Sequence, residues 1–207
     1  MFTATHLLRR RRFLPLFVTQ LFNAFNDNLY KTTMVLFVVY AVYNDETTES
    51  SFSSLASALF ILPFFILSAL AGQLADMRDK AKIIRTVKMC EIGLMMIGAA
   101  GLYMAWRGIM VHTVAIPLLL LALFLTGVQS TFLGPIKYAI LPQHLKKDEV
   151  LAGTGLVEAG TYIAILMGTI LAGPLAVDYT GWAAMGIIVV SCIGYMISRQ
   201  IPPAPPL

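Results

Sequence analysis

Three polar side chains and a lysine interrupt an otherwise apolar stretch in the first part of the chain. The segment reads Phe25-Asn26-Asp27-Asn28-Leu29-Tyr30-Lys31. A carboxylate at bilayer depth is expensive, so Asp27 should face a protein interior or a water-filled cavity. Lys31 lies one helical turn further on, at a spacing that allows it to pair with Asp27. The two charges either satisfy each other as an internal ion pair or bind a charged ligand.

Further charged residues lie inside later apolar stretches. Lys137 follows Gly134-Pro135, where proline breaks the helical hydrogen-bond ladder and a bend can present the lysine to a cavity. The alternative is that Lys137 snorkels toward the membrane surface. Glu158 stands among small residues and is expected to face the interior. Glu91, three residues after Lys88, is instead expected to form a local surface pair near the lipid headgroups.

Asp27, Lys137 and Glu158 together supply two anionic groups and one cation, with asparagine amides as further hydrogen-bond partners. Such a set complements a zwitterion. Enzymatic chemistry is not indicated, because the sequence has no Gly-rich phosphate loop and its three histidines lie at loops or termini. We therefore predict no catalytic residue, no metal and no cofactor, and a substrate-binding site made of Asn26, Asp27, Asn28, Lys31, Lys137 and Glu158.

Long apolar runs must position these residues. Hydrophobic residues make up 58% of the 207-residue chain and charged residues only 13%, and the mean hydropathy is +0.77, which is outside the range of soluble domains. Each of six runs approaches or exceeds the roughly 20 residues that cross a bilayer as a helix. We predict an all-α polytopic membrane protein with six transmembrane helices, over residues 13–43, 52–75, 83–106, 113–140, 150–177 and 182–197.

Small residues recur at four-residue spacing in the fifth of these runs. They are Gly160, Ala164, Gly168 and Ala172. Small side chains let helices approach closely in a membrane, so this pattern predicts tight packing without contact to a substrate.

Charged residues outside the runs predict the orientation of the bundle. Arg9 to Arg12 precede the first run, and other basic residues cluster in the second and fourth turns, so both termini are expected in the cytoplasm. This placement explains the net charge of +4 without nucleic acid. We expect a basic cytoplasmic N-terminus over residues 1–12, a six-helix bundle over 13–198 and a proline-rich cytoplasmic linker over 199–207. The composition of this linker favours a polypeptide that continues.

A short basic turn separates the second and third runs. Gly72 is expected to end the second helix, and Asp76 then lies within reach of Arg78 and Lys82. We predict that these four residues form a charge-pair latch. The turn resembles the signature of the major facilitator superfamily, although Asp79 stands where that signature usually has glycine. The resemblance implies the N-terminal half of that fold, with three-plus-three helix repeats. It also implies a second six-helix half, supplied by the same polypeptide or by a second copy.

A narrower resemblance rests on three motifs. Phe25 to Asn28, Gly134 to Leu141 and Leu156 to Ala159 resemble the bacterial lysophospholipid transporter family. The resemblance implies a transporter that moves lysophospholipids, of the lysophosphatidylethanolamine type, across the bacterial inner membrane for reacylation, by alternating access. In such a transporter Asp27 and Glu158 would bind the amine of the headgroup and Lys137 its phosphate. Membrane lipids and an acyltransferase, fused or separate, are the implied partners.

Two alternatives share much of this pattern. An exporter of drugs or other small amphipathic solutes would have the same bundle and latch but would not require the Asn26-Asp27-Asn28 motif. In the second alternative these helices are the membrane anchor and transport part of a fused phospholipid acyltransferase, whose catalytic domain would follow Leu207. Within these residues we expect no enzymatic activity.

Overall fold

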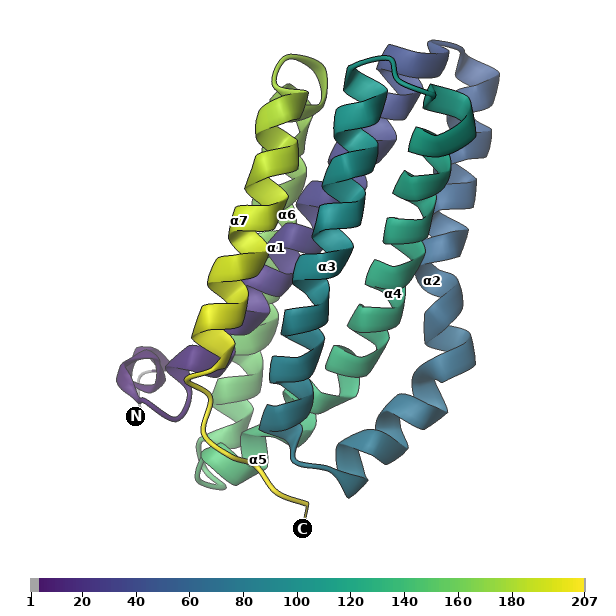
Figure 1. Cartoon of the computed structure of the whole chain (residues 1–207). Coiled ribbons are helices and arrows are strands. Elements are labelled where there is room, and N and C mark those ends of the chain that lie inside the picture. Colours follow the sequence, from purple (N-terminus) through teal and green to yellow (C-terminus); the bar gives the residue numbers. More distant parts are fainter. Residues whose placement is uncertain (1–3, 207) are drawn as a thin grey trace.

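The computed structural model describes residues 4–206 as a helical bundle (Figure 1). Its six long helices are α1 (Leu14–Phe37), α2 (Glu46–Met77), α3 (Lys80–Trp106), α4 (Ile116–Ala139), α6 (Val150–Val177) and α7 (Thr180–Ser198). Shorter pieces flank them: 3₁₀-helix η1 (Ala4–Arg9), π-helices η2 (Val38–Tyr43) and η3 (Val111–Ala115), and the one-turn α5 (Leu141–His144). No strand occurs within residues 4–206, which confirms the all-α prediction for this part of the chain.

Five of the long segments have the length and apolar composition to cross a membrane, namely α2, α3, the continuous η3–α4 segment, α6 and α7. α1 differs because polar residues occupy its middle. It still runs through the bundle beside α6 and α7 (Figure 1), and several of these polar residues are buried. The first predicted span is therefore a helix with several polar side chains buried by its neighbours, and the chain is a multi-pass membrane protein.

The turn between α2 and α3 is shorter than the sequence suggested. α2 continues past Gly72, so the expectation that Gly72 ends this helix is wrong. The Asp79 carboxylate caps α3 by accepting hydrogen bonds from the backbone N–H groups of Ala81 at 2.9 Å and Lys82 at 3.3 Å. The backbone of Asp79 is extended, with φ −61° and ψ 115°. Glycine is therefore not needed at this position.

Close helix contacts in the bundle depend on glycine. α1 packs mainly against α6 and α7, α2 packs against α4, and α3 packs against α4 and α7. A Cβ atom at Gly168 of α6 would lie 2.6 Å from the carbonyl oxygen of Phe25 in α1, and one at Gly127 of α4 would lie 2.3 Å from that of Phe60 in α2. These contacts confirm the predicted packing role of the small residues in the fifth apolar run.

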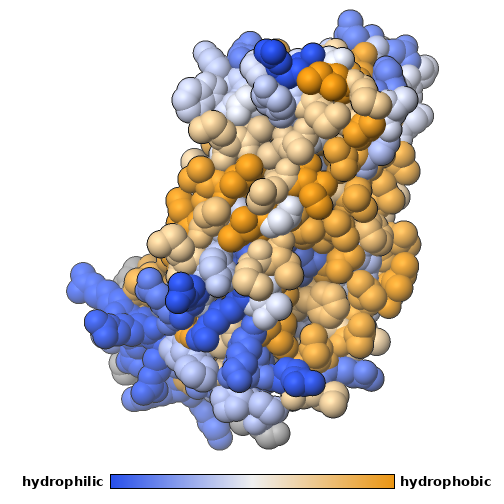
Figure 2. Space-filling model, in the orientation of Figure 1, coloured by the Kyte–Doolittle hydropathy of each residue, from blue (hydrophilic) through white to orange (hydrophobic). Residues whose placement is uncertain are grey.

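The surface has the polarity profile of a membrane protein. On the face shown in Figure 2, a largely hydrophobic band covers the middle of the bundle, and hydrophilic residues gather at its two ends. Both termini lie at the same end (Figure 1). That end carries the Arg9 to Arg12 cluster and the α2–α3 turn, so most of the basic residues outside the bundle lie there.

We predict that Gly168→Ala destabilises the bundle by about 1–3 kcal/mol, because the new methyl group meets the rigid backbone of α1 instead of a side chain that can move. Thermal unfolding in detergent micelles measures the effect. Gly173→Ala in the same helix is the matched control, since a Cβ there meets nothing within 4 Å. Alanine has a higher helix propensity than glycine, so the control substitution should leave the stability unchanged or raise it slightly. Equal midpoints for both variants would contradict the close α1–α6 contact.

Candidate functional site

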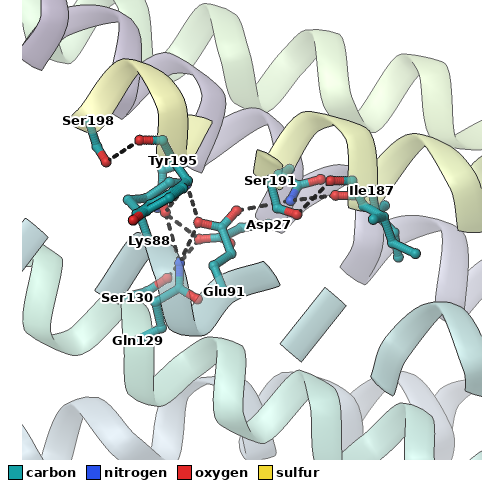
Figure 3. Close-up of polar contacts among 12 residues, drawn as sticks. Asp27, Lys88, Glu91, Gln129, Ser130, Ile187, Ser191, Tyr195 and Ser198 are labelled. Carbon is teal, nitrogen blue, oxygen red and sulfur yellow. Dashed lines mark hydrogen bonds and ion pairs between the residues drawn. The ribbon is translucent and has the colours of Figure 1, made fainter. Parts of the chain in front are cut away.

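A fully buried ion pair occupies the interior of the bundle. Lys88 and Glu91 of α3 are both 0% exposed and form a close ion pair. Glu91 also accepts hydrogen bonds from the side-chain amides of Asn26 in α1 and Gln129 in α4, each at 3.0 Å. Figure 3 shows this cluster, with Asp27 and Ser130 beside it. The expectation that Glu91 forms a surface pair near the headgroups is wrong.

A helical period in the sequence could have located this pair. Ile84, Lys88, Glu91, Met95 and Leu102 recur every three to seven residues, and all five are buried on one face of α3. A local i,i+3 pair was compatible with either face of the helix. The apolar residues that share its stripe indicate the inward face.

Amide groups connect the ion pair to three other helices. The Asn23 carbonyl oxygen of α1 accepts hydrogen bonds from the Gln129 amide of α4 at 3.0 Å and from the Lys88 ammonium at 3.4 Å. The Asn26 amide also donates to the backbone carbonyl of Ile187 in α7 at 3.2 Å. One polar network therefore joins α1, α3, α4 and α7, and Asn26 belongs to this network and not to the lining of the cavity described below.

Asp27 lies at the edge of the network. Its Oδ2 atom accepts hydrogen bonds from the Ser130 hydroxyl at 2.7 Å and from the Asn23 amide at 3.1 Å. Its Oδ1 atom is buried and accepts no hydrogen bond within residues 4–206. The predicted pair with Lys31 is not among the ion pairs of this part of the chain, and the Lys31 ammonium instead lies 5.1 Å from the centre of the Phe60 ring.

A cavity of about 350 Å³ opens beside Asp27. Asn28 also lines it, while the amide of Asn28 donates to the Ala24 carbonyl at 2.8 Å within α1. Four of the six predicted site residues therefore meet at one cavity. Its lining comes from α1, α2, α4 and α6 and consists of Gln20, Asn23, Ala24, Asp27, Asn28, Lys31, Phe60, Phe64, Ser130, Leu133, Gly134, Lys137, Thr161 and Ile165.

Lys137 connects this cavity to Glu158. α4 continues through Pro135 without a break in the helix and places Lys137 in its last turn. The Lys137 ammonium lies 3.2 Å from Glu158 Oε1 of α6, and the Tyr138 hydroxyl donates to the same oxygen. Both charged side chains are partly exposed, at 17% for Lys137 and 34% for Glu158. A ligand can therefore reach both members of this pair.

The predicted latch residues lie at the end of the bundle that carries the termini, away from this cavity. Asp76, Arg78 and Lys82 are exposed, and Gly72 lies within α2. Within residues 4–206 no ion pair joins Asp76 to Arg78 or to Lys82. The latch therefore stays a prediction from the sequence resemblance.

The charges around the cavity balance one another. Asp27 and Glu158 are acidic, Lys31 and Lys137 are basic, and all four belong to the cavity or contact a residue that lines it. Phe60, Phe64 and Ile165 give the same cavity apolar walls. The arrangement can bind a zwitterion that carries an apolar part.

Comparison with known proteins gives a family and a set of relatives. The family model described as Major Facilitator Superfamily matches residues 16–206. The chain is similar to a protein named lysophospholipid transporter LplT from Enterobacter sp. (strain 638), with 26% identity over 188 residues, covering 91% of this chain and 42% of the relative. Proteins of the same name from Salmonella heidelberg (strain SL476) and Cronobacter sakazakii (strain ATCC BAA-894) are also 26% identical, over 88% and 89% of the chain. The chain spans about two fifths of the length of these relatives.

We predict that the buried pair tolerates joint neutralisation better than loss of one partner. Lys88→Met leaves the Glu91 carboxylate buried and unpaired, which should cost about 3–5 kcal/mol of unfolding free energy. The double variant Lys88→Met/Glu91→Gln removes both charges and keeps an acceptor for the amides, so it should be more stable than Lys88→Met alone.

Unfolding in mixed detergent micelles tests this expectation as a double-mutant cycle. Lys82→Met is the control, because Lys82 is an exposed lysine of the same helix. Strictly additive effects of the two single substitutions would show that Lys88 and Glu91 do not stabilise each other.

Proposed function

The chain belongs to the Major Facilitator Superfamily, and from this premise we propose that it is the N-terminal six-helix half of a lysophospholipid transporter. The observation that carries the proposal is the cavity, in which two acidic and two basic groups stand beside apolar walls. A lysophospholipid with an ethanolamine headgroup has the matching parts, namely a phosphate, an ammonium group and one acyl chain. The relatives are named lysophospholipid transporters, which supports the same substrate class.

The Lys137–Glu158 pair gives headgroup binding a physical mechanism. These two charges neutralise each other at 3.2 Å. A lysolipid phosphate can take the place of the Glu158 carboxylate on Lys137, because charge-assisted hydrogen bonds of this kind are strong. The released Glu158 is then free to bind the ammonium group of the same headgroup. A zwitterion therefore replaces one ion pair with two and leaves no charge unpaired.

Asp27 offers a second position for the ammonium group. Its Oδ1 atom has no hydrogen-bond partner within residues 4–206, while Ser130 and Asn23 hold Oδ2 in place. A carboxylate fixed in this way costs little further ordering when a ligand binds. Asn28 and Lys31 line the same cavity and complete the proposed headgroup site, and Asn26 supports it from the buried network.

The proposal extends to the membrane and to partners. We assign the protein to the bacterial inner membrane with both termini in the cytoplasm, because the basic residues outside the bundle gather mostly at the end that carries the termini. A second six-helix half would complete the cavity and allow alternating access, with the latch of Gly72, Asp76, Arg78 and Lys82 acting at the cytoplasmic side. A fused or separate acyltransferase would consume the transported lysolipid.

We predict that Asp27→Asn and Lys137→Ala each lower lysophosphatidylethanolamine transport by the full-length protein about tenfold or more, since each removes a charge-assisted contact worth about 1.5–3 kcal/mol. Uptake of labelled lysolipid into spheroplasts measures the effect. Lys146→Ala is the control, because Lys146 is exposed and lies outside the cavity. If both variants transport like the parent protein, the site is wrong. If lysolipids also fail to displace a bound amphipathic drug, the protein is an exporter of other solutes.

We further predict that Glu158→Gln changes the headgroup preference. The substitution leaves Lys137 without its charged partner and makes the charge around the cavity more positive. Uptake of a lysolipid with an anionic headgroup should therefore increase relative to uptake of one with a zwitterionic headgroup. A change of about tenfold in the ratio of lysophosphatidylglycerol to lysophosphatidylethanolamine uptake corresponds to about 1.4 kcal/mol. Asp148→Asn, at an exposed acidic residue, should leave the ratio unchanged. An unchanged ratio in Glu158→Gln would exclude Glu158 from headgroup recognition.

A further inference from the structure

The proline-rich segment that follows α7 is attached to the bundle. Residues 201–206, here called the strap, run from the end of α7 past the start of α3 and α5 toward the end of the bundle (Figure 1). Two of its side chains, Ile201 and Ala204, are 1% exposed and pack within the hydrophobic cluster at this end of the bundle. The composition of the segment is typical of an extended connector, yet a free connector would not bury these two side chains.

Hydrogen bonds from α3 and α5 hold the strap along its length. The backbone N–H of Lys80 donates to the Ala204 carbonyl at 2.9 Å. The Arg85 guanidinium donates to the Ile201 carbonyl, and the Gln143 amide donates to the Pro205 carbonyl at 3.2 Å. Four residues of the strap are proline and donate no backbone hydrogen bond, so Ile201 and Ala204 supply its only backbone N–H groups.

Asp79 uses the Ala204 N–H group. Its Oδ1 atom, which caps α3, also accepts a hydrogen bond from the Ala204 backbone at 3.1 Å. The contact is reciprocal, because Lys80 bonds the carbonyl of the same residue. Asp79 is also the position at which the superfamily signature usually has glycine, a residue with no side chain to make this contact.

Electrostatics keep this acceptor charged. Partial burial raises the pKa of Asp79. Hydrogen bonds from the backbone N–H groups of Ala204, Lys82 and Ala81, together with the Lys82 charge, lower it by more than burial raises it, so the pKa lies below the usual value. The carboxylate is therefore ionised at neutral pH, and its hydrogen bond to the strap is charge-assisted.

We propose that Asp79 is a positioning residue that clamps the strap to the start of α3, so that the end of α7, the strap and the α2–α3 turn form one rigid unit. The turn carries Arg78, and the first turn of α3 carries Lys82. Pro205 and Pro206 line a pocket of about 650 Å³ together with these two side chains. Motion of α7 is then passed directly to the turn. The proposal is independent of which substrate the protein carries.

Distance measurements between two spin labels test the clamp in the full-length protein. The labels are placed at Pro206→Cys in the strap and Lys147→Cys, an exposed site in the α5–α6 connection, after all native cysteines have been replaced. We expect one narrow distance peak in the otherwise unmodified protein. Asp79→Gly, which removes the acceptor, and Ala204→Pro, which removes the donor and keeps the carbonyl that Lys80 bonds, should both lose that peak and give a broad distribution.

Two matched controls separate the clamp from other effects. Asp79→Asn keeps an oxygen acceptor for both the helix cap and the strap, so it should keep the narrow peak. Pro203→Ala exchanges the same two residue types as Ala204→Pro at an exposed neighbouring position, and it should also keep the peak. A narrow peak in Asp79→Gly and Ala204→Pro, or a broad distribution before any change to the clamp, would overturn the proposal.

Discussion

The buried ion pair of Lys88 and Glu91 constrains how α1, α3, α4 and α7 face one another inside the bundle. Two charges without solvent exposure are tolerated only when hydrogen bonds and the opposite charge replace the lost water. Asn23, Asn26 and Gln129 supply those bonds from two other helices. A rotation of α1 or α4 would leave these groups unpaired, so the network fixes how the helices face one another. It also explains how α1, which carries polar residues in its middle, is held within the bundle.

The cavity inherits its geometry from this network. Asn23 bonds both the buried cluster and Asp27, so the carboxylate at the cavity is anchored to the rigid interior. On the other side of the cavity, Lys137 and Glu158 are partly exposed and bond each other. The site thus combines a fixed acidic group with an ion pair that a ligand can open. This combination favours a ligand that carries both charges, because an anion or a cation alone would leave one member of the pair unsatisfied.

At the end of the bundle that carries the termini, Asp79 stands where the turn signature of the superfamily usually has glycine, and its side chain makes additional contacts. Asp79 adds a charged acceptor to a turn whose backbone does not require glycine. The same oxygen caps α3 and bonds the strap after α7. At the same end, Arg10 pairs with Glu149 at 2.9 Å and joins the N-terminal segment to the start of α6. Segments far apart in the sequence are therefore fastened together on the side where the basic residues gather.

The sequence by itself determined the six long helices, because long, mostly apolar runs without alternation favour helices of bilayer length. It also singled out Asp27, Lys137 and Glu158, since charges within such runs are costly. Which charged side chains pair with each other was decided only by the tertiary structure. Lys31 has the right spacing for Asp27 but lies over Phe60, whereas Lys137 pairs with Glu158 from another helix. Spacing identifies the residues that share a helix face, but it does not say which face is buried or which helix lies opposite. For that reason Glu91 was expected at the surface, and the clamp between Asp79 and Ala204, 125 residues apart, had no signal in the sequence.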